Sequence, residues 1–345
     1  GQTVKIIDFD EPEKNEFVVT RQFRVDGPNE IIIPDIVIFV NGLPLAVIEC
    51  KSPYVSNPMA TGIDQLLRYT NSRTPLSNEG SERLFWYNQI LVSTYGDQAR
   101  LGTVSSLAEH YLEWKDPYPL RVEEVRSAPL RPEGRRPSGH PLPASPARGA
   151  QEKDIGGTGG TRPLGHSAAI SSQSILLAGV FRKENLLDLI RSFIVFDTVD
   201  GKTIKKIARY QQYRAVHKAI ARLKTPGNRR DRGGVVWHTQ GSGKSLTMVF
   251  TAARIRRDPE LHGYKLVFMT DRTTLDRQLT ATFQRCQDET VFHASSVAEL
   301  KALLKKDSSD LVTCMLQKFQ EDEWGKAEEL NASPRIVLMV DEAHR

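Results

Sequence analysis

The sequence predicts an α/β fold in two parts, and three features along the chain indicate it. Apolar runs of strand length dominate residues 1–126. Strand-like and helix-like runs alternate through residues 173–345, which is typical of a parallel sheet with helices on both faces. Between them, residues 127–172 are rich in Pro, Gly, Arg and Ser and cannot bury enough apolar surface to order themselves. We therefore expect two domains, 1–126 and 173–345, joined by a disordered low-complexity linker.

The composition is that of an ordinary globular protein. The 345 residues are 26% charged and 39% hydrophobic, and 47 Lys and Arg against 42 Asp and Glu give a net charge of +5. This balance is compatible with a polyanionic partner. The three cysteines, Cys50, Cys286 and Cys314, lie far apart and form no metal-binding or disulfide pattern. Since the sequence has no signal peptide and no apolar run of membrane-spanning length, we expect a reduced, cytoplasmic protein.

Hydrophobic patterning predicts the individual elements. In the first part, the predicted strands are Phe17–Val25, Ile31–Val40, Leu45–Cys50 and Ile90–Thr94, and the predicted helices are Thr61–Asn71 and Val104–Trp114. In the second part, the predicted helices are Lys183–Phe193, Tyr210–Leu223, Ser245–Arg256 and Leu275–Cys286. The strands predicted there are Gly234–Trp237, Lys265–Thr270 and Ile336–Val340.

A glycine-rich turn before the predicted helix Ser245–Arg256 indicates a nucleotide site, because residues 234–245 read GVVWHTQGSGKS. In such a turn, backbone N–H groups and the helix N-terminus hold phosphate oxygens. Lys244 can then reach the β- and γ-phosphates, although His238 stands where this motif usually has its first glycine. The residues expected to bind ATP and its Mg²⁺ here are Thr239, Gly241, Ser242, Gly243, Lys244 and Ser245, with the Ser245 hydroxyl on the metal.

Two carboxylates directly follow the apolar run Ile336–Val340. This position is the carboxyl edge of a buried strand, where α/β sheets bind their ligands. We expect Asp341 to hold Mg²⁺ and Glu342 to orient and deprotonate the attacking water.

Together the two segments resemble superfamily 2 helicases and translocases, in the first of their RecA-like lobes. The resemblance rests on residues 239–245 and on the DEAH sequence at 341–344. It implies a RecA-like P-loop domain with a parallel sheet and an ATP-driven motor on nucleic acid. Three further stretches fit this family, namely Arg209–Gln212, where Gln212 would contact adenine, and the DNA-strand segments Met269–Gln278 and Thr313–Phe319.

Residues 31–51 predict a hairpin of two buried strands that turns at Asn41-Gly42. Unpaired charge inside such strands is costly, and metal binding would explain why charge is present there. Glu49 and Lys51 lie two residues apart on one strand and therefore share a face.

The register of this hairpin decides whether Asp35 reaches the same face. A strict two-residue turn would pair Asp35 with Ile48 and direct it away from Glu49. A three-residue loop, or one bulge near Pro44, pairs it with Glu49. We predict the second register and hence a Mg²⁺ site between Asp35 and Glu49, with Glu16 as a further candidate acidic contact.

The P-D…E-x-K arrangement of Asp35, Glu49 and Lys51 resembles the PD-(D/E)xK nucleases. This resemblance implies a mixed sheet flanked by helices, Mg²⁺ held by the two carboxylates, and Lys51 positioning water at the cleaved phosphate. Gln65 and Tyr69 lie four residues apart on the next predicted helix and so share one side of it. They match the catalytic Q-x-x-x-Y element of nucleases that resemble RecB.

A nuclease site followed by a superfamily 2 motor resembles the R (restriction and translocation) subunit of type I restriction–modification enzymes. The resemblance covers nearly the whole chain outside residues 127–172. It implies an ATP-dependent subunit that translocates double-stranded DNA, cleaves it with Mg²⁺, and works with specificity and methyltransferase subunits. The sequence ends at Arg345, before the second RecA-like lobe of this family, so we expect it to bind nucleotide weakly and hydrolyse little.

Three other interpretations stay open at this point. A repair-type nuclease–helicase would carry both motifs and need no methyltransferase partner. An RNA helicase of the DEAH type would not need Lys51. A truncated, inactive docking fragment would fit the unusual composition of residues 127–172.

Overall fold

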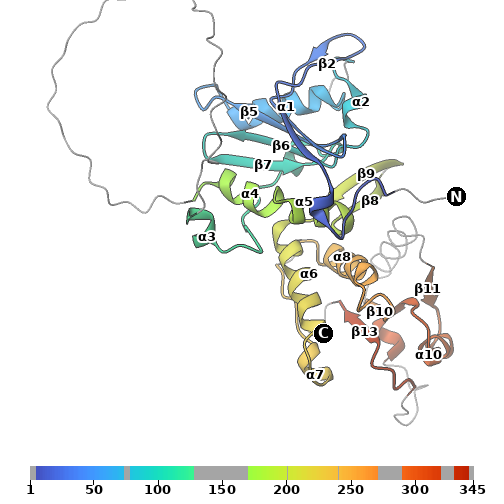
Figure 1. Cartoon of the computed structure of the whole chain (residues 1–345). Helices are drawn as coiled ribbons and strands as arrows, with labels where there is room; N and C mark the ends of the chain where they lie inside the picture. The colour runs from blue at the N-terminus through green and yellow to red at the C-terminus, as the bar shows by residue number, and fades with distance from the viewer. Residues whose placement is uncertain are drawn as a thin grey trace, which may run out of the picture.

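The chain forms two main β-sheets joined by a group of helices (Figure 1). A computed structural model describes residues 5–73, 78–127, 170–199, 201–239, 241–270, 290–319 and 330–341. Residues 128–169 of the predicted linker and the predicted helix Leu275–Cys286 lie outside these ranges.

The N-terminal sheet is mixed, as the resemblance to nucleases implies. Its strands lie in the order β1-β4-β5-β6-β7, with β5 and β6 parallel and the other neighbours antiparallel. They are β1 (Phe17–Arg21), β4 (Ile36–Val40), β5 (Leu43–Lys51), β6 (Ile90–Tyr95) and β7 (Gln98–Gly102). The short strands β2 (Val25–Asp26) and β3 (Ile31–Ile32) form a separate hairpin. The predicted strand Ile31–Val40 is divided in two because Pro34 has no N–H to donate to a ladder.

Successive side chains of this sheet point to two buried faces. On β5, Val47 packs in one hydrophobic cluster with the buried side chains of α1 (Pro58–Tyr69). The next residue, Ile48, belongs to a second cluster that includes buried residues of α4 (Ser172–Val180). Helices therefore cover both faces, and α1 lies over the face that carries residues 47, 49 and 51.

Residues after the predicted linker pack against the N-terminal sheet. The elements there are α4, α5 (Lys183–Ser192), the antiparallel hairpin β8 (Ile194–Val199) and β9 (Lys202–Ile207), α6 (Tyr210–Leu223), α7 (Arg229–Arg232) and α8 (Lys244–Arg257). The cluster that holds Ile48 continues through α5, α6 and α8 into the strands of the C-terminal part, as far as Val337. The carboxylate of Asp188 on α5 also contacts His217 of α6 at 2.8 Å and Arg254 of α8 at 3.4 Å. One hydrophobic cluster thus joins both parts of the chain, and the predicted domain limits stay a prediction.

The C-terminal sheet is fully parallel across its described strands, which confirms the prediction. Its order is β11-β12-β10-β13. The strands are β10 (Lys265–Thr270), β11 (Val291–Ala294), β12 (Leu311–Met315) and β13 (Ile336–Val340), and α10 (Val297–Lys305) connects β11 to β12. The remaining described helices are α2 (Glu82–Phe85), α3 (Val122–Ser127) and the 3-10 turns Pro12–Lys14, Ala108–His110 and Leu316–Phe319.

The predicted strand Gly234–Trp237 is wrong for this structure. A strand requires a hydrogen-bonded neighbour. Among the described strands, β13 is the edge of the C-terminal sheet, and residues 234–237 do not pair with it. Val235 is 89% exposed and Trp237 is 81% exposed, which shows that the apolar pattern there is not buried.

The predicted helix Val104–Trp114 is also wrong. Leu112 exchanges two backbone hydrogen bonds of 2.9 Å with Leu101 at the end of β7. This bridge holds the chain extended. A single 3-10 turn, Ala108–His110, forms within the segment in place of the predicted helix. Tyr111 and Trp114, which suggested a helix, are buried in two different hydrophobic clusters and not along one side of a helix.

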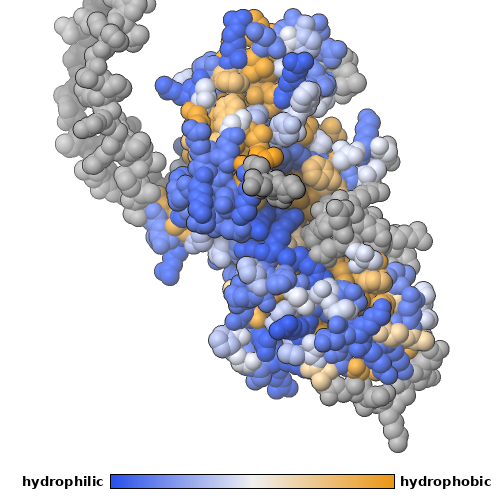
Figure 2. All heavy atoms as spheres, turned by 45° about the vertical axis from the view of Figure 1, so that its right-hand side comes forward, coloured by the Kyte–Doolittle hydropathy of each residue, from blue (hydrophilic) through white to orange (hydrophobic). Residues whose placement is uncertain are grey.

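Hydrophobic residues reach the surface in both parts of the described chain. Figure 2 shows them as orange areas among hydrophilic residues on the visible face. Strand β1 lies at the edge of its sheet and leaves Val18 40% and Val19 63% exposed. Within the described ranges, no helix combines the length and the apolar character needed to cross a bilayer.

The close approach of α1 to the sheet depends on Gly62. A Cβ at this position would collide with the Ser93 hydroxyl and lie 3.3 Å from Cγ of Lys51. We therefore expect Gly62→Ala to lower the free energy of unfolding by about 1–3 kcal/mol, because α1 must move away from β5 and β6. Thermal unfolding followed by circular dichroism measures this effect.

The matched control is Gly263→Ala, where a new Cβ meets no atom within 4 Å. It should leave the unfolding midpoint nearly unchanged. Equal midpoints for the two variants would contradict the tight packing of α1.

Candidate functional site

The turn between β4 and β5 is tied to the N-terminal segment of the chain. Asn41 (φ 49°) and Gly42 (φ 80°) both adopt the left-handed conformation that a two-residue hairpin turn requires. The Asn41 side chain accepts a hydrogen bond from the Glu16 backbone at 2.7 Å and donates one to the Ile6 carbonyl at 2.8 Å. Glu16 therefore lies beside the turn, at the end of β4 opposite to Asp35. Its suggested role as a further acidic contact is wrong.

A β-bulge follows this turn and resets the register. Phe39 pairs with Pro44, but Ile38 pairs with Ala46, so Leu45 is the extra residue on β5. The prediction of a bulge near Pro44 is confirmed.

This register brings Asp35 to the face that carries Glu49. Ile36 pairs with Ile48, so the next pair along the two strands is Asp35 with Glu49. The Asp35 carboxylate accepts hydrogen bonds from the backbone N–H of Cys50 at 2.8 Å and from the side-chain amide of Gln22 at 2.6 Å. These two neutral donors hold the carboxylate in place.

Glu49 is a buried carboxylate, with 1% of the residue exposed. One oxygen, Oε1, accepts a hydrogen bond from the Lys51 ammonium at 2.8 Å, whereas Oε2 is buried and has no hydrogen-bond partner. Burial raises the pKa of Glu49 to about 7, because desolvation outweighs the bond from Lys51 and the negative charge of Asp35 acts in the same direction as burial. Lys51 therefore compensates the ionised form of Glu49 only in part, through Oε1, and Oε2 lacks a partner.

Lys51, Gln65 and Tyr69 form a chain of hydrogen bonds that leads away from Glu49. The Lys51 ammonium donates to the carbonyl oxygen of Gln65. The Gln65 amide donates to the Tyr69 hydroxyl, which in turn donates to the Ile33 carbonyl at 3.3 Å. The sequence pattern thus corresponds to one connected set of side chains, Asp35, Glu49, Lys51, Gln65 and Tyr69, which we call the carboxylate site.

The donor set of the carboxylate site fits a hard divalent cation. Two carboxylates share one face, and a bound cation would give the buried Glu49 oxygen the partner that it lacks. Among the described residues, no group of three or more His, Cys, Asp or Glu side chains forms a metal cluster. A hard divalent cation bound by one or two carboxylates completes its coordination with water and phosphate oxygens.

The glycine-rich turn has the backbone that the nucleotide prediction requires. Gly241 (φ 75°) and Gly243 (φ 82°) are left-handed, and α8 begins at Lys244 directly afterwards. The backbone N–H of Ser242 donates to the Thr239 carbonyl at 3.2 Å. We call Thr239–Ser245 the P-loop.

Gln212 is bound to the P-loop rather than open to solvent. The residue is 2% exposed, and its side-chain amide donates to the Gly243 carbonyl at 2.9 Å. Its carbonyl oxygen accepts from the Arg209 backbone at 2.8 Å. Contact of Gln212 with adenine stays a prediction, but the structure gives this side chain a second task, which is to hold the turn at Gly243.

Some of the other residues named for the nucleotide site lie within the described ranges. The His238 imidazole lies close enough to Lys244 for the ammonium to lower its pKa, although burial is the larger cause. Asp341 follows β13 and continues the ladder by donating its backbone N–H to the Met269 carbonyl at 2.9 Å. Glu342 and residues 271–278 lie outside the described residues. In the segment Thr313–Phe319, residues 313–315 end β12 and residues 316–319 form a 3-10 turn.

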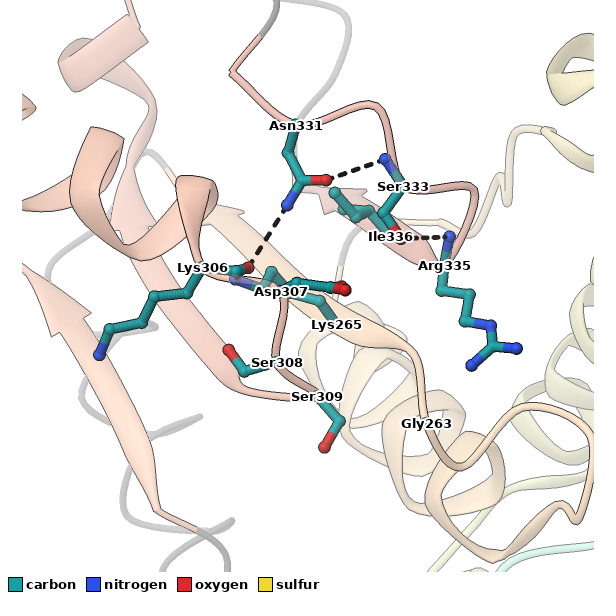
Figure 3. A pocket seen from close by; sticks show the side chains of 10 residues that line it. All are labelled: Gly263, Lys265, Lys306, Asp307, Ser308, Ser309, Asn331, Ser333, Arg335 and Ile336. Carbon is teal, nitrogen blue, oxygen red and sulfur yellow. Dashed lines mark hydrogen bonds between the residues drawn. The ribbon is translucent and has the colours of Figure 1, made fainter.

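A cavity of about 290 Å³ lies at the opposite edge of the C-terminal sheet (Figure 3). It opens between Lys265 and Ile336, the first residues of β10 and β13, and is also lined by Lys306, Asp307 and Arg335. Asp341 follows the other end of β13, so this cavity is not part of the nucleotide site.

Known families match both ends of the chain. Residues 1–110 match the type I restriction enzyme R protein N terminus, and residues 211–345 match the SWI2/SNF2 ATPases.

Curated relatives match almost the whole chain. A putative type I restriction enzyme MjaIXP endonuclease subunit from Methanocaldococcus jannaschii is 33% identical over 99% of this chain and 30% of its own length. The type I restriction enzyme HindI endonuclease subunit from Haemophilus influenzae is 34% identical over 100% of this chain and 29% of its own length. The chain therefore spans about 30% of the length of the curated relatives it matches.

The raised pKa of Glu49 makes a prediction about stability without metal. A carboxyl group whose folded pKa lies above its unfolded value stabilises the fold below the unfolded pKa, and this contribution is lost as the pH rises through the folded pKa. Wild type should therefore lose stability relative to Glu49→Gln between about pH 4.5 and pH 7. At pH 8, with chelator present, we expect the Gln variant to be more stable by up to about 3 kcal/mol.

Chemical denaturation at pH 4.5 and pH 8 measures this difference. The two proteins should have similar stability at the lower pH. A Gln variant that is less stable than wild type at pH 8 would contradict the assignment of Glu49 as an unsatisfied buried carboxylate.

Proposed function

We propose that this chain contains the DNA-cleaving site and the first part of the ATP-driven motor of a type I restriction endonuclease subunit. Support comes from the match of residues 1–110 to the type I restriction enzyme R protein N terminus and of residues 211–345 to the SWI2/SNF2 ATPases. The observation that carries the proposal is the carboxylate site, in which Asp35 and Glu49 share one face and one Glu49 oxygen is buried without a partner. Lys51, Gln65 and Tyr69 extend from the other Glu49 oxygen as a chain of hydrogen bonds. The relatives named as endonuclease subunits favour this function over a repair nuclease–helicase, an RNA helicase or an inactive docking fragment.

In this proposal, Asp35 and Glu49 bind Mg²⁺ next to the phosphodiester bond that is cleaved. A bound divalent ion supplies Lewis-acid activation of the phosphate and lowers the pKa of a water molecule. Support for a divalent metal comes from the unpartnered Glu49 oxygen and its raised pKa, since a cation would favour the ionised form.

Lys51 places a positive charge at this phosphate. The Lys51 side chain is 16% exposed and its ammonium is held between Glu49 and Gln65, so little conformational entropy is lost when it meets an anionic substrate. Gln65 fixes Lys51, and Tyr69 fixes Gln65 through its hydroxyl. In our proposal, Gln65 and Tyr69 act on the reaction through Lys51.

The P-loop is proposed to bind the phosphates of ATP. Lys244 would contact the β- and γ-phosphates, and Ser245 and Asp341 would hold the Mg²⁺ of the nucleotide. Glu342 would orient the attacking water. Support comes from the match to the SWI2/SNF2 ATPases and from the left-handed glycines that direct backbone N–H groups inward.

Double-stranded DNA is the proposed substrate of the carboxylate site, and the motor is proposed to translocate it while hydrolysing ATP at the P-loop. The names of the relatives as restriction endonuclease subunits support a multi-subunit complex, in which we propose that specificity and methyltransferase subunits read the recognition sequence. A cytoplasmic location is part of the same proposal.

Nicking of supercoiled plasmid DNA in the presence of MgCl₂ tests the nuclease proposal. We expect Asp35→Ala and Lys51→Ala each to lower the nicking rate about 100-fold or more, because the first removes a ligand of the metal ion and the second removes the positive charge beside the phosphate. Asp26→Ala, which removes an exposed carboxylate of β2, should nick at the wild-type rate. Wild-type nicking by Asp35→Ala would refute the proposal.

The bond between Gln212 and the P-loop predicts an effect on nucleotide affinity. We expect Gln212→Ala to weaken binding of a fluorescent ATP analogue by about 5- to 20-fold, because the turn at Gly243 loses a buried hydrogen bond. Gln211→Ala, at the neighbouring position of α6, is the matched control and should bind normally. If the two variants bind equally well, Gln212 does not support the P-loop.

A further inference from the structure

Gln22 has an unusual backbone conformation directly beside the carboxylate site. Four non-glycine residues among those described have a positive φ, and the other three, at positions 41, 57 and 71, are asparagines. Asparagine tolerates the left-handed region, whereas glutamine adopts it rarely. The φ of 50° at Gln22 is therefore strained, and strain of this kind is often found at functional sites.

The chain on both sides of Gln22 imposes this conformation. Before it, β1 pairs with β4 as far as Arg21 opposite Ile36. After it, the ring of Phe23 packs edge-on against Phe39, with ring centroids 5.3 Å apart. Between these two anchors, Gln22 keeps one ladder bond by donating its backbone N–H to the Asp35 carbonyl at 2.9 Å.

The same residue also holds the side chain of Asp35. The Gln22 amide donates to Oδ1 of Asp35 at 2.6 Å, while the backbone N–H of Cys50 donates to Oδ2 at 2.8 Å. Each carboxylate oxygen therefore has one fixed donor and keeps lone pairs for a cation. Gln22 thus contacts Asp35 through both backbone and side chain.

An amide suits this task better than a charged side chain would. A Lys or Arg donor would neutralise Asp35 and compete with a metal ion for it. The neutral amide orients the carboxylate and leaves its negative charge in place. Partners of this kind fix metal-binding side chains in many proteins, and their loss commonly lowers metal affinity about 10- to 100-fold.

We propose that Gln22 is a positioning residue that orients Asp35 for the divalent cation of the carboxylate site. This inference rests on the proposed function, because it assumes that Asp35 binds the metal. Gln22 itself contacts neither the cation nor the substrate in this account, and it acts through Asp35.

Calorimetric titration of the full chain with MgCl₂, without nucleotide, tests the proposal directly. We expect Gln22→Ala and Gln22→Gly to weaken Mg²⁺ binding to a similar extent, about 10- to 100-fold, because both lack the amide. Their thermal stabilities should differ, since glycine relieves the left-handed strain and alanine does not. If Mg²⁺ affinity depends on the missing amide whereas thermal stability depends on whether residue 22 is Ala or Gly, Gln22 positions Asp35. A purely structural role would make affinity and stability change together.

Asn57→Gly is the matched control. Asn57 is also left-handed, with φ of 48°, and its side chain does not cap α1, which it precedes. This variant should bind Mg²⁺ with wild-type affinity, which shows that a glycine at a left-handed position does not by itself weaken the metal site.

Two results would overturn the inference, and Asp35→Ala distinguishes them. If Asp35→Ala loses Mg²⁺ binding but both Gln22 variants keep wild-type affinity, Gln22 does not position the ligand and the proposed function stands. If Asp35→Ala also binds Mg²⁺ normally, the metal site itself is wrong and the proposed function falls with the inference.

Discussion

The β-bulge at Leu45 is the constraint on which the carboxylate site depends. Side chains alternate along a strand, so one residue more or less would turn Asp35 to the face opposite to Glu49. The left-handed turn at Asn41 and Gly42 fixes the start of the ladder, and the bulge then shifts it by one position. Two carboxylates that are 14 positions apart in sequence thereby share one face.

Bringing these two negatively charged carboxylates together is electrostatically unfavourable, and the surrounding residues compensate only part of that charge. The Lys51 ammonium donates a hydrogen bond to one oxygen of Glu49, but the other oxygen is buried without a partner. Burial therefore raises the pKa of Glu49 to about 7. Such a cost is expected where a protein is organised for a ligand rather than for its own stability. The strained backbone of Gln22 and the close approach of α1 at Gly62 lie beside the same group of side chains.

Much of this site could be predicted from the sequence, because its pattern is local. Asn41-Gly42 indicates the turn, and the two-residue spacing of Glu49 and Lys51 puts them on one face whatever the rest of the fold. The role of Gln22 could not be predicted, because its contact with Asp35 depends on a left-handed turn that an ordinary glutamine does not signal. The strand expected at residues 234–237 failed for a related reason, since apolar residues form a strand only beside a hydrogen-bonded partner. Likewise, local patterns could not show that α4 packs on the N-terminal sheet, because that contact joins residues far apart in the chain.

We propose that Asp35 and Glu49 bind one divalent ion together, which can be tested with a double-mutant cycle of Mg²⁺ affinity on Asp35→Asn, Glu49→Gln and the double variant. If both carboxylates hold the same ion, either single substitution removes most of the binding, and the second adds little to the loss. Independent effects that simply add in free energy would contradict a shared site.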